Sequence, residues 1–178
     1  KELDAKVSNI LRLIFRTSMD PHKPFGSLGS PEHGQAGREI AEEGIVLLQN
    51  NGNVLPIDLN KAKKIAVVGE NAIKLMTGGG GSSSLKVKYE ISPLDGLKSR
   101  VGSKAEVVYA RGYVGDPTGE YNGVKTGLDL KDNRSEDELL AEALQVAKDA
   151  DYVIFFGGLH KINHQDCEDS DRASLGLP

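Results

Sequence analysis

The sequence has a single cysteine, Cys167, and no uninterrupted run of about 18 apolar residues. One cysteine excludes an internal disulfide framework, because each bridge needs a pair. The absence of a long apolar run excludes a transmembrane helix, so we expect no membrane partner. Positive charge is also scarce: the formal net charge is −4 and the lysines are scattered. The sequence therefore lacks the basic patch that is typical of proteins that bind nucleic acids.

Composition and length indicate a folded globular protein. Of the 178 residues, 38% are hydrophobic and 27% are charged, a balance that is typical of proteins with a hydrophobic core. The length allows one domain, or one domain with a short appendage. The chain opens on Lys1 rather than on a start methionine, and Ser174–Pro178 offers neither the pattern of a closing helix nor a polar tail. We therefore expect a piece of a longer protein.

The N-terminal part of the chain is expected to hold two helices joined by a linker. Apolar residues recur at helical spacing over residues 3–16 and form one stripe, which consists of Leu3, Val7, Ile10, Leu11 and Ile14. The stretch Thr17–His33 contains three prolines and two glycines, so we predict a linker without regular structure. A second helix is predicted from about Gly34 to Gln49, because the cluster Asn50–Asn53 that follows suits left-handed turns.

Three short apolar runs alternate with helix signals in the rest of the chain. The runs Lys64–Gly69, Glu106–Ala110 and Asp151–Gly157 predict strands, and the first, which is continuously apolar, fits a strand buried on both faces. Each of the segments Ser92–Asp95 and Ser135–Glu138 places a carboxylate three residues after a serine, which is the signature of a helix start. This alternation predicts an α/β fold, with a mostly parallel sheet flanked by helices.

Two loops that follow strands are the candidate functional segments. Ligands of open parallel sheets bind beyond the carboxyl ends of the strands. The first strand leads into a glycine and serine loop, Gly78–Ser84, and the third leads into residues 160–172, which we call the acidic loop. The acidic loop places four carboxylates within six residues, Asp166–Asp171. Crowding of like charges raises the pKa of at least one carboxyl group, as a general acid near neutral pH requires. The segment Gly112–Asp132, rich in glycine and polar residues, is expected to be an exposed loop.

Several motifs together resemble glycoside hydrolase family 3, of the β-glucosidase type. They occur in the family's order and consist of His33–Asn50 with Asn53–Ile57, then Ile65–Ala72, Gly78–Ser83, Ser92–Leu97, and Asp171–Arg172 with Leu175–Pro178. The resemblance implies that residues 1–20 are the last helix of a (β/α)8-type barrel domain. It implies that residues 21–33 are an interdomain linker, and that residues 34–178 are the first part of an incomplete α/β-sandwich domain.

The resemblance also implies an activity and its residues. Family members of this type remove terminal β-linked sugars, most often glucose, with retention of configuration. An aspartate of the barrel, outside this sequence, forms a covalent intermediate, and a glutamate of the second domain is the general acid/base. Glu168, the only glutamate of the acidic loop, is the candidate for that role, while Asp166 and Asp169 remain alternatives. Gly80, Ser82, Ser83 and His164 are candidate contacts for the sugar. Arg172 is expected to brace the loop by pairing with Asp171 or Asp169, and a contact with the substrate is the alternative.

Other interpretations of the same residues remain open at this point. His160, His164 and Cys167 share one irregular loop without a second cluster, so we expect no metal site and no cofactor. The run Ile65–Gly69 before a glycine-rich loop also suggests a nucleotide-binding regulatory domain, although neither a G-x-G-x-x-G nor a P-loop pattern follows it. A third possibility is a non-catalytic scaffold that packs on a barrel. The resemblance is compatible with a periplasmic or secreted bacterial protein.

Overall fold

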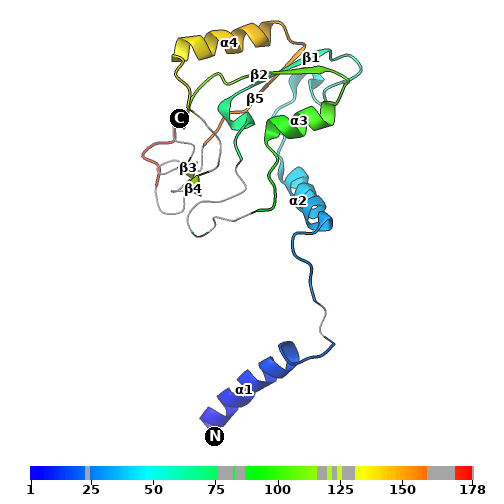
Figure 1. Ribbon diagram of the computed structural model, residues 1–178, viewed down its shortest axis with the longest axis vertical. Coiled ribbons are helices and arrows are strands. Elements are labelled where there is room, and N and C mark those ends of the chain that lie inside the picture. The colour runs from blue at the N-terminus through cyan, green and yellow to red at the C-terminus, as the bar shows by residue number, and fades with distance from the viewer. Residues whose placement is uncertain are drawn as a thin grey trace. The chain divides into compact units, whose positions relative to one another are not determined.

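The structure consists of two compact units, Lys1–Leu48 and Gln49–Pro178. It is a computed structural model, and it describes residues 1–22, 25–75, 82, 87–115, 120–121, 124–125, 131–159 and 171–177 (Figure 1). None of the helices within these ranges is long and apolar enough to cross a membrane.

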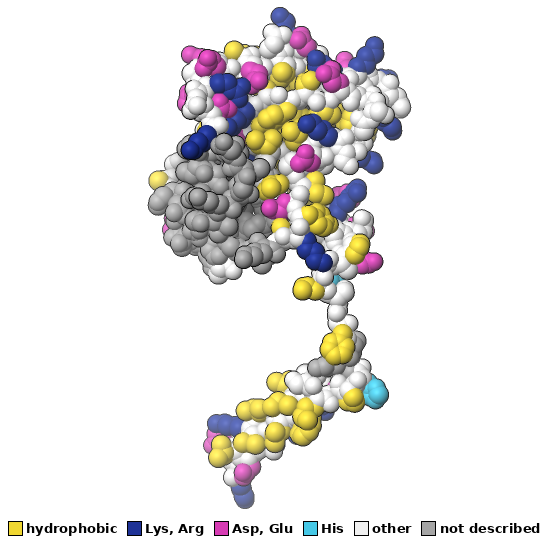
Figure 2. Space-filling model, in the orientation of Figure 1, with side chains coloured by type: hydrophobic (Ala, Val, Ile, Leu, Met, Phe, Trp, Pro, Cys, Tyr) yellow, Lys and Arg dark blue, Asp and Glu magenta, His cyan; other side chains and the backbone are white. Residues whose placement is uncertain are grey.

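The first unit contains the helices α1 (Glu2–Thr17) and α2 (Pro31–Gly44), and neither has a buried residue. The expected helix over residues 3–16 is confirmed by α1. Its apolar stripe is uncovered, since the five stripe residues are between 39% and 72% exposed. Figure 2 shows hydrophobic side chains gathered along this helix. An uncovered stripe of this kind is what a helix presents when its packing partner is another part of a protein.

The boundaries predicted for the second helix were wrong at both ends. The helix starts at Pro31, inside the segment that we had expected to be an irregular linker, and it ends at Gly44 instead of Gln49. Ser30 is extended at the N-cap and proline occupies the first helical position, which favours a start there. At the other end Gly44 is followed by the β-branched residues Ile45 and Val46, both poor helix formers, and Ile45 is extended.

The core of the second unit is a parallel sheet of three strands in the order β2-β1-β5. The strands are β1 (Lys64–Val68), β2 (Glu106–Ala110) and β5 (Tyr152–Phe155), which confirms the three predicted runs. In register, Val67 of β1 lies opposite Tyr109 on one side and Ile154 on the other. The central position of β1 explains its continuously apolar sequence, because its side chains are buried on both faces.

Helices α3 (Pro93–Val101) and α4 (Glu136–Lys148) lie on opposite faces of this sheet, so the unit has three layers (Figure 1). Ile65 and Val67 pack toward α3, where they meet Val101 and Leu94, respectively. Val68 packs on the other face, against Ala143 of α4. Alternation of this kind follows from the two-residue repeat of a strand. The α/β fold with a parallel sheet and flanking helices is therefore confirmed.

Both helices start at the predicted caps. The Ser92 hydroxyl accepts a hydrogen bond from the Asp95 backbone, and Ser135 and Glu138 form a complete capping box. Short 3-10 turns, η1 (Asn51–Asn53) and η2 (Glu70–Ala72), flank β1 in the sequence.

The expectation of an exposed loop over Gly112–Asp132 was wrong in part. This segment contains two short antiparallel strands, β3 (Glu120–Tyr121) and β4 (Val124–Lys125), with Tyr121 opposite Val124. Its described ends, Gly112–Gly115 and Asp132, are partly buried rather than exposed. The glycine and polar content suggested solvent exposure, but the start of the segment packs on the end of β1, where a Cβ on Gly112 would lie 2.9 Å from Val68 Cγ1.

Candidate active site

The carboxyl ends of the three parallel strands meet at one edge of the sheet. There β1 continues into Gly69–Leu75, which we call the β1 stem, and β5 continues into Phe156–Leu159, the β5 stem. On the other side of β1 from β5, β2 continues into Arg111–Gly115. The β1 stem leads toward the glycine and serine loop and the β5 stem leads into the acidic loop, so the bases of both candidate segments lie at this edge.

Backbone contacts tie each stem to a neighbouring strand, and the two stems meet at Gly69 and Phe156. The Phe156 amide donates a hydrogen bond to the Val68 carbonyl at 2.7 Å, and the Gly69 amide donates one to the Ala110 carbonyl at 3.2 Å. Gly69 has a φ of +119°, and a Cβ atom there would lie 2.1 Å from the Phe156 carbonyl oxygen. Glycine is therefore required at this position, both for the backbone conformation and for the contact between the strands.

A buried cluster of charges holds the β1 stem against the segment after β2. The side chain of Glu70 is fully buried and lies between Lys74 Nζ, 2.9 Å from Oε1, and Arg111 Nη2, 2.8 Å from Oε2. Arg111 Nε and the Gly115 amide donate to the same Oε2 at 3.2 and 3.1 Å. These charge-assisted hydrogen bonds compensate a carboxylate that is removed from water. The cluster was missed from the sequence, because Arg111 lies 41 positions after Glu70.

The cluster continues outward to helix α4. Arg111 Nη1 lies 3.4 Å from Asp132 Oδ2, which also accepts a hydrogen bond from Arg134 at 2.7 Å. Arg134 in turn pairs with Glu142 of α4 at 2.6 Å. Hydrogen bonds from Arg134 hold the pKa of the Asp132 carboxyl well below its usual range, so Asp132 is ionised at neutral pH. The segment after β2 is thus tied to both the β1 stem and α4.

Two tyrosine hydroxyls donate to carbonyl groups of the stems. Tyr113 donates to Phe156 O at 3.0 Å, and Tyr109 donates to Gly69 O at 3.3 Å. Burial raises the pKa of both phenols, so each hydroxyl keeps its proton and remains a donor at neutral pH. The Tyr113 ring also packs against Phe155, with 6.0 Å between the ring centroids.

Asn71 lies where the two stems meet. Its side chain is 7% exposed, and no group of the described residues donates a hydrogen bond to its Oδ1. Its Nδ2 lies 3.4 Å from the position that a Cβ on Gly158 would occupy, and Gly158 has a φ of +141°. One sequence signal points to such a residue, since a polar side chain directly after a buried strand lies at the carboxyl edge.

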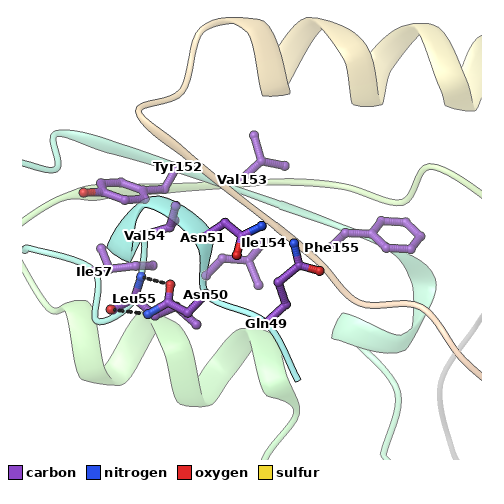
Figure 3. A pocket seen from close by; sticks show the side chains of 10 residues that line it. All are labelled: Gln49, Asn50, Asn51, Val54, Leu55, Ile57, Tyr152, Val153, Ile154 and Phe155. Atoms are coloured by element: carbon purple, nitrogen blue, oxygen red, sulfur yellow. Dashed lines mark hydrogen bonds between the residues drawn. The ribbon is translucent and has the colours of Figure 1, made fainter. Parts of the chain in front are cut away.

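A pocket of about 490 Å³ lies elsewhere, along β5 and the segment Gln49–Ile57 (Figure 3). The Asn50 side chain shapes its wall through two hydrogen bonds with the backbone of Leu55, of 2.8 and 3.0 Å. Most of its lining is apolar, and it includes the exposed side chains of Val153 and Phe155. Among the described residues, Tyr152 is the only titratable one that lines it. The pocket therefore offers no pair of acid and base groups, and the carboxyl edge remains the candidate active site.

Comparison with known proteins decides the family. Residues 45–178 match the model of the glycosyl hydrolase family 3 C-terminal domain. The chain belongs to glycoside hydrolase family 3. The beta-glucosidase BoGH3A of Bacteroides ovatus is 46% identical over 97% of this chain, and a beta-xylosidase of Formosa agariphila is 33% identical over 99%. The chain spans 23% of the length of each of these relatives.

Solved structures of the family agree with this assignment. A GH3 beta-glucosidase of Bifidobacterium adolescentis superposes with a TM-score of 0.68 at 29% identity, over 94% of this chain and 21% of the other. The b-glucosidase EmGH1 of Erythrobacter marinus gives a TM-score of 0.66 at 32% identity, over 84% of this chain and 21% of the other.

Most of the site residues that the family 3 resemblance implied lie outside the described residues. These are Glu168 with its alternatives Asp166 and Asp169, and the sugar contacts Gly80, Ser83 and His164. Ser82 is described and exposed. Asp171 and Arg172 are also exposed, and the expected pairing of Arg172 with Asp171 or Asp169 stays a prediction. At an exposed site such a pair gains little over solvation by water.

The zinc interpretation concerned residues that are not described. His160, His164 and Cys167 all lie outside the described ranges. Within those ranges, no group of three or more His, Cys, Asp or Glu side chains is placed to hold a metal ion.

Proposed function

We propose that this chain supplies the general acid/base of a retaining, exo-acting β-glycosidase, and that the substrate is a terminal β-glucoside. The observation that carries the proposal is the 46% identity over 97% of the chain to a protein named beta-glucosidase. Family 3 membership and the run of carboxylates that follows the β5 stem support it further. The aspartate nucleophile belongs to a barrel domain outside this sequence, so residues 1–178 alone are expected to be inactive.

The proposed division of the chain is a barrel helix at residues 1–20, a linker at 21–33, and the first part of the α/β-sandwich domain at 34–178. The uncovered apolar stripe of α1 supports the first assignment, because a barrel would bury it. The match to the C-terminal domain model, which begins at residue 45, supports the last.

In the proposed mechanism Glu168 acts twice. In the first step its proton moves to the glycosidic oxygen while the bond from that oxygen to the anomeric carbon breaks and the barrel aspartate bonds to the same carbon. In the second step the Glu168 carboxylate takes a proton from water, the water oxygen attacks the anomeric carbon, and the bond to the aspartate breaks. Retention requires the two carboxyl groups to lie about 5–5.5 Å apart. The neighbouring Asp166 and Asp169 favour a raised pKa for Glu168, as an acid at neutral pH needs.

The glycine and serine loop is proposed to border the sugar. Gly80 would let the backbone approach the substrate closely, and Ser82 and Ser83 carry hydroxyls that suit hydrogen bonds to sugar hydroxyls. His164 of the acidic loop is proposed as a further polar contact. The exposure of Ser82 is compatible with a contact to ligand.

The test is Glu168→Ala in the complete protein, with Asp166→Ala and Asp169→Ala as matched variants. Loss of the acid is expected to reduce kcat/KM by about 10²–10⁴-fold for glycosides with poor leaving groups, and far less for dinitrophenyl glycosides. Azide should restore turnover of the activated substrates, because it replaces the water that Glu168 no longer activates. If either aspartate variant shows this selective loss and Glu168→Ala does not, the assignment of Glu168 is wrong.

Xylose is the second candidate sugar beside glucose, because the relative that matches 99% of this chain is named a beta-xylosidase. We expect the complete protein to have a higher kcat/KM for nitrophenyl β-glucoside than for nitrophenyl β-xyloside. The reverse preference would replace glucose by xylose in the proposal and leave the role of Glu168 unchanged.

The nucleotide-binding alternative gains no support from Gly69. A phosphate-binding turn uses glycine so that an anion can approach the backbone, whereas the space beside Gly69 is taken by the Phe156 carbonyl oxygen. Calorimetric titration with ATP and with NAD tests the point, and micromolar affinity for either would favour the alternative.

A further inference from the structure

The β5 stem is the part of the sheet from which the acidic loop departs. The Phe156 amide closes the ladder between β1 and β5 through its bond to Val68 O, 2.7 Å long. The Phe156 carbonyl, which follows it, accepts the Tyr113 hydroxyl at 3.0 Å. Among the described residues this is the last hydrogen bond on the stem before residue 160. The next two residues are Gly157 and Gly158, which have no side chains to fix the direction of the chain.

Tyr113 is itself held firmly from both sides. Two residues before it, Arg111 is fixed in the buried cluster with Glu70, and two residues after it, the Gly115 amide donates to the same carboxylate at 3.1 Å. The ring packs against Phe155 of β5. The Tyr113 hydroxyl is therefore a donor on a rigid support, aimed at the residue where the regular strand has already ended.

We propose that Tyr113 is a positioning residue for catalysis: its hydrogen bond to the Phe156 carbonyl fixes the direction in which the acidic loop leaves the sheet. This inference rests on the function proposed above for the acidic loop. Tyr113 acts through the backbone and touches neither the substrate nor the reacting atoms. Once the Phe156 carbonyl loses this bond, the two glycines that follow offer no side chain to restrain the direction of the chain. A shift of about 1 Å at a catalytic group is enough to cost about 10²-fold in rate.

The test is Tyr113→Phe in the complete protein, with Tyr109→Phe as the matched control. Each change removes one hydroxyl that donates to a strand-end carbonyl and keeps the ring, but the Tyr109 hydroxyl bonds to Gly69 on the β1 stem. The Tyr113 hydroxyl also accepts a hydrogen bond from the Asn71 backbone, which Tyr113→Phe removes as well. Both variants are expected to lower Tm by no more than about 2–4 °C, because each loses only one or two hydrogen bonds and the shift in Tm becomes smaller as a protein becomes larger. The Tm values of the two variants therefore show whether the two changes disturb the fold to a similar extent.

A positioning role is distinguished from a purely structural role by how the loss in kcat/KM depends on the leaving group of the substrate. Tyr113→Phe should lower kcat/KM at least about tenfold for a glucoside with a poor leaving group, and less than about threefold for dinitrophenyl glucoside, because only the former needs a well-placed acid. Tyr109→Phe should change kcat/KM for both substrates by the same factor, because its hydroxyl holds the β1 stem and not the β5 stem. If Tyr113→Phe lowers both substrates equally, or behaves as Tyr109→Phe does, Tyr113 has no positioning role.

Glu168→Ala, measured in parallel, distinguishes failure of this inference from failure of the proposed function. A selective loss in Glu168→Ala without one in Tyr113→Phe overturns the role of Tyr113 alone. A selective loss in Tyr113→Phe without one in Glu168→Ala supports the role of Tyr113 and overturns the choice of Glu168, since the acid must then be another group. Absence of a selective loss in both variants overturns both.

Discussion

The Phe156 carbonyl oxygen occupies the space beside Gly69 so closely that a Cβ atom on Gly69 would lie 2.1 Å from it. The end of β1 and the end of β5 can approach this far only because residue 69 has no side chain. The contact joins the β1 stem to the β5 stem at the point where both leave the sheet. The carboxyl edge is thus built partly on backbone packing, beside the buried side chains of Glu70, Lys74 and Arg111.

Gly69→Ala is expected to destabilise the protein strongly. The change combines a φ of +119°, which residues with a side chain rarely adopt, with a clash against backbone atoms. Together these should lower the free energy of unfolding by about 2–5 kcal/mol in urea denaturation. Gly52→Ala is the matched control, because Gly52 also has a positive φ, +74°, but has no atom within 4 Å of the added Cβ. It should cost about 1–2 kcal/mol. Equal losses would show that the contact with Phe156 relaxes without cost.

Removal of the carboxylate at the centre of the buried cluster is expected to cost more than loss of an exposed ion pair. Glu70→Gln removes the negative charge that faces Lys74 and Arg111 inside the protein, while Arg111 keeps its pair with Asp132, and we expect about 3–5 kcal/mol of destabilisation. Lys61→Met is the control, since Lys61 pairs with Asp58 at 3.4 Å with 83% of its side chain exposed. That change should stay within about 1 kcal/mol. Similar midpoints for the two variants in urea denaturation would contradict this account of the cluster.

Local signals predicted the three strands of the parallel sheet and both helices of the second unit. Ser92 and Ser135 fixed the starts of α3 and α4, because a cap depends on residues within one turn of the helix. The continuously apolar run of β1 identified the centre of the sheet for a similar reason. By contrast, the ends of α2 depended on a balance between weak propensities on both sides of Gly44, and there the prediction was wrong.

The contacts of the carboxyl edge could not be predicted in the same way. Glu70 pairs with Arg111 only because the parallel order β2-β1-β5 brings distant segments to one edge. The hydrogen bond from Tyr113 to Phe156 has the same cause. The sequence indicates that loops meet there, since ligand sites of parallel sheets follow the strands. It does not indicate which polar side chains pair, because an ion pair has no periodic pattern. The assignment of Glu168 came from family resemblance and stays a prediction.

The start of β5 should give the protein a dependence of stability on pH. Asp151 Oδ2 accepts hydrogen bonds from the backbone amides of Lys64 and Lys63, at 2.9 and 2.8 Å, and these bonds lower the pKa of the carboxyl group. A lowered pKa in the folded state means that the stabilisation is present above the unfolded pKa, about 3.9, and is lost as the pH falls through the folded value. Asp151→Asn should therefore be less stable than the wild type at pH 7, with the gap closing below about pH 4. A gap that is independent of pH in thermal unfolding would contradict a role for the charge.

The capping box of α4 should contribute to the stability of the layer that covers one face of the sheet. The Ser135 hydroxyl accepts the Glu138 amide at 3.3 Å, and the Glu138 carboxylate accepts the Ser135 amide at 2.8 Å. Ser135→Ala removes the first of these bonds, and we expect it to lower the free energy of unfolding by about 1 kcal/mol. Ser99→Ala is the control, because Ser99 is an exposed interior residue of α3, where alanine is the better helix former. It should leave stability unchanged or slightly raised in urea denaturation. If the two changes have equal effects, α4 does not depend on its cap, and the packing of Leu139 and Ala143 alone must hold it on the sheet.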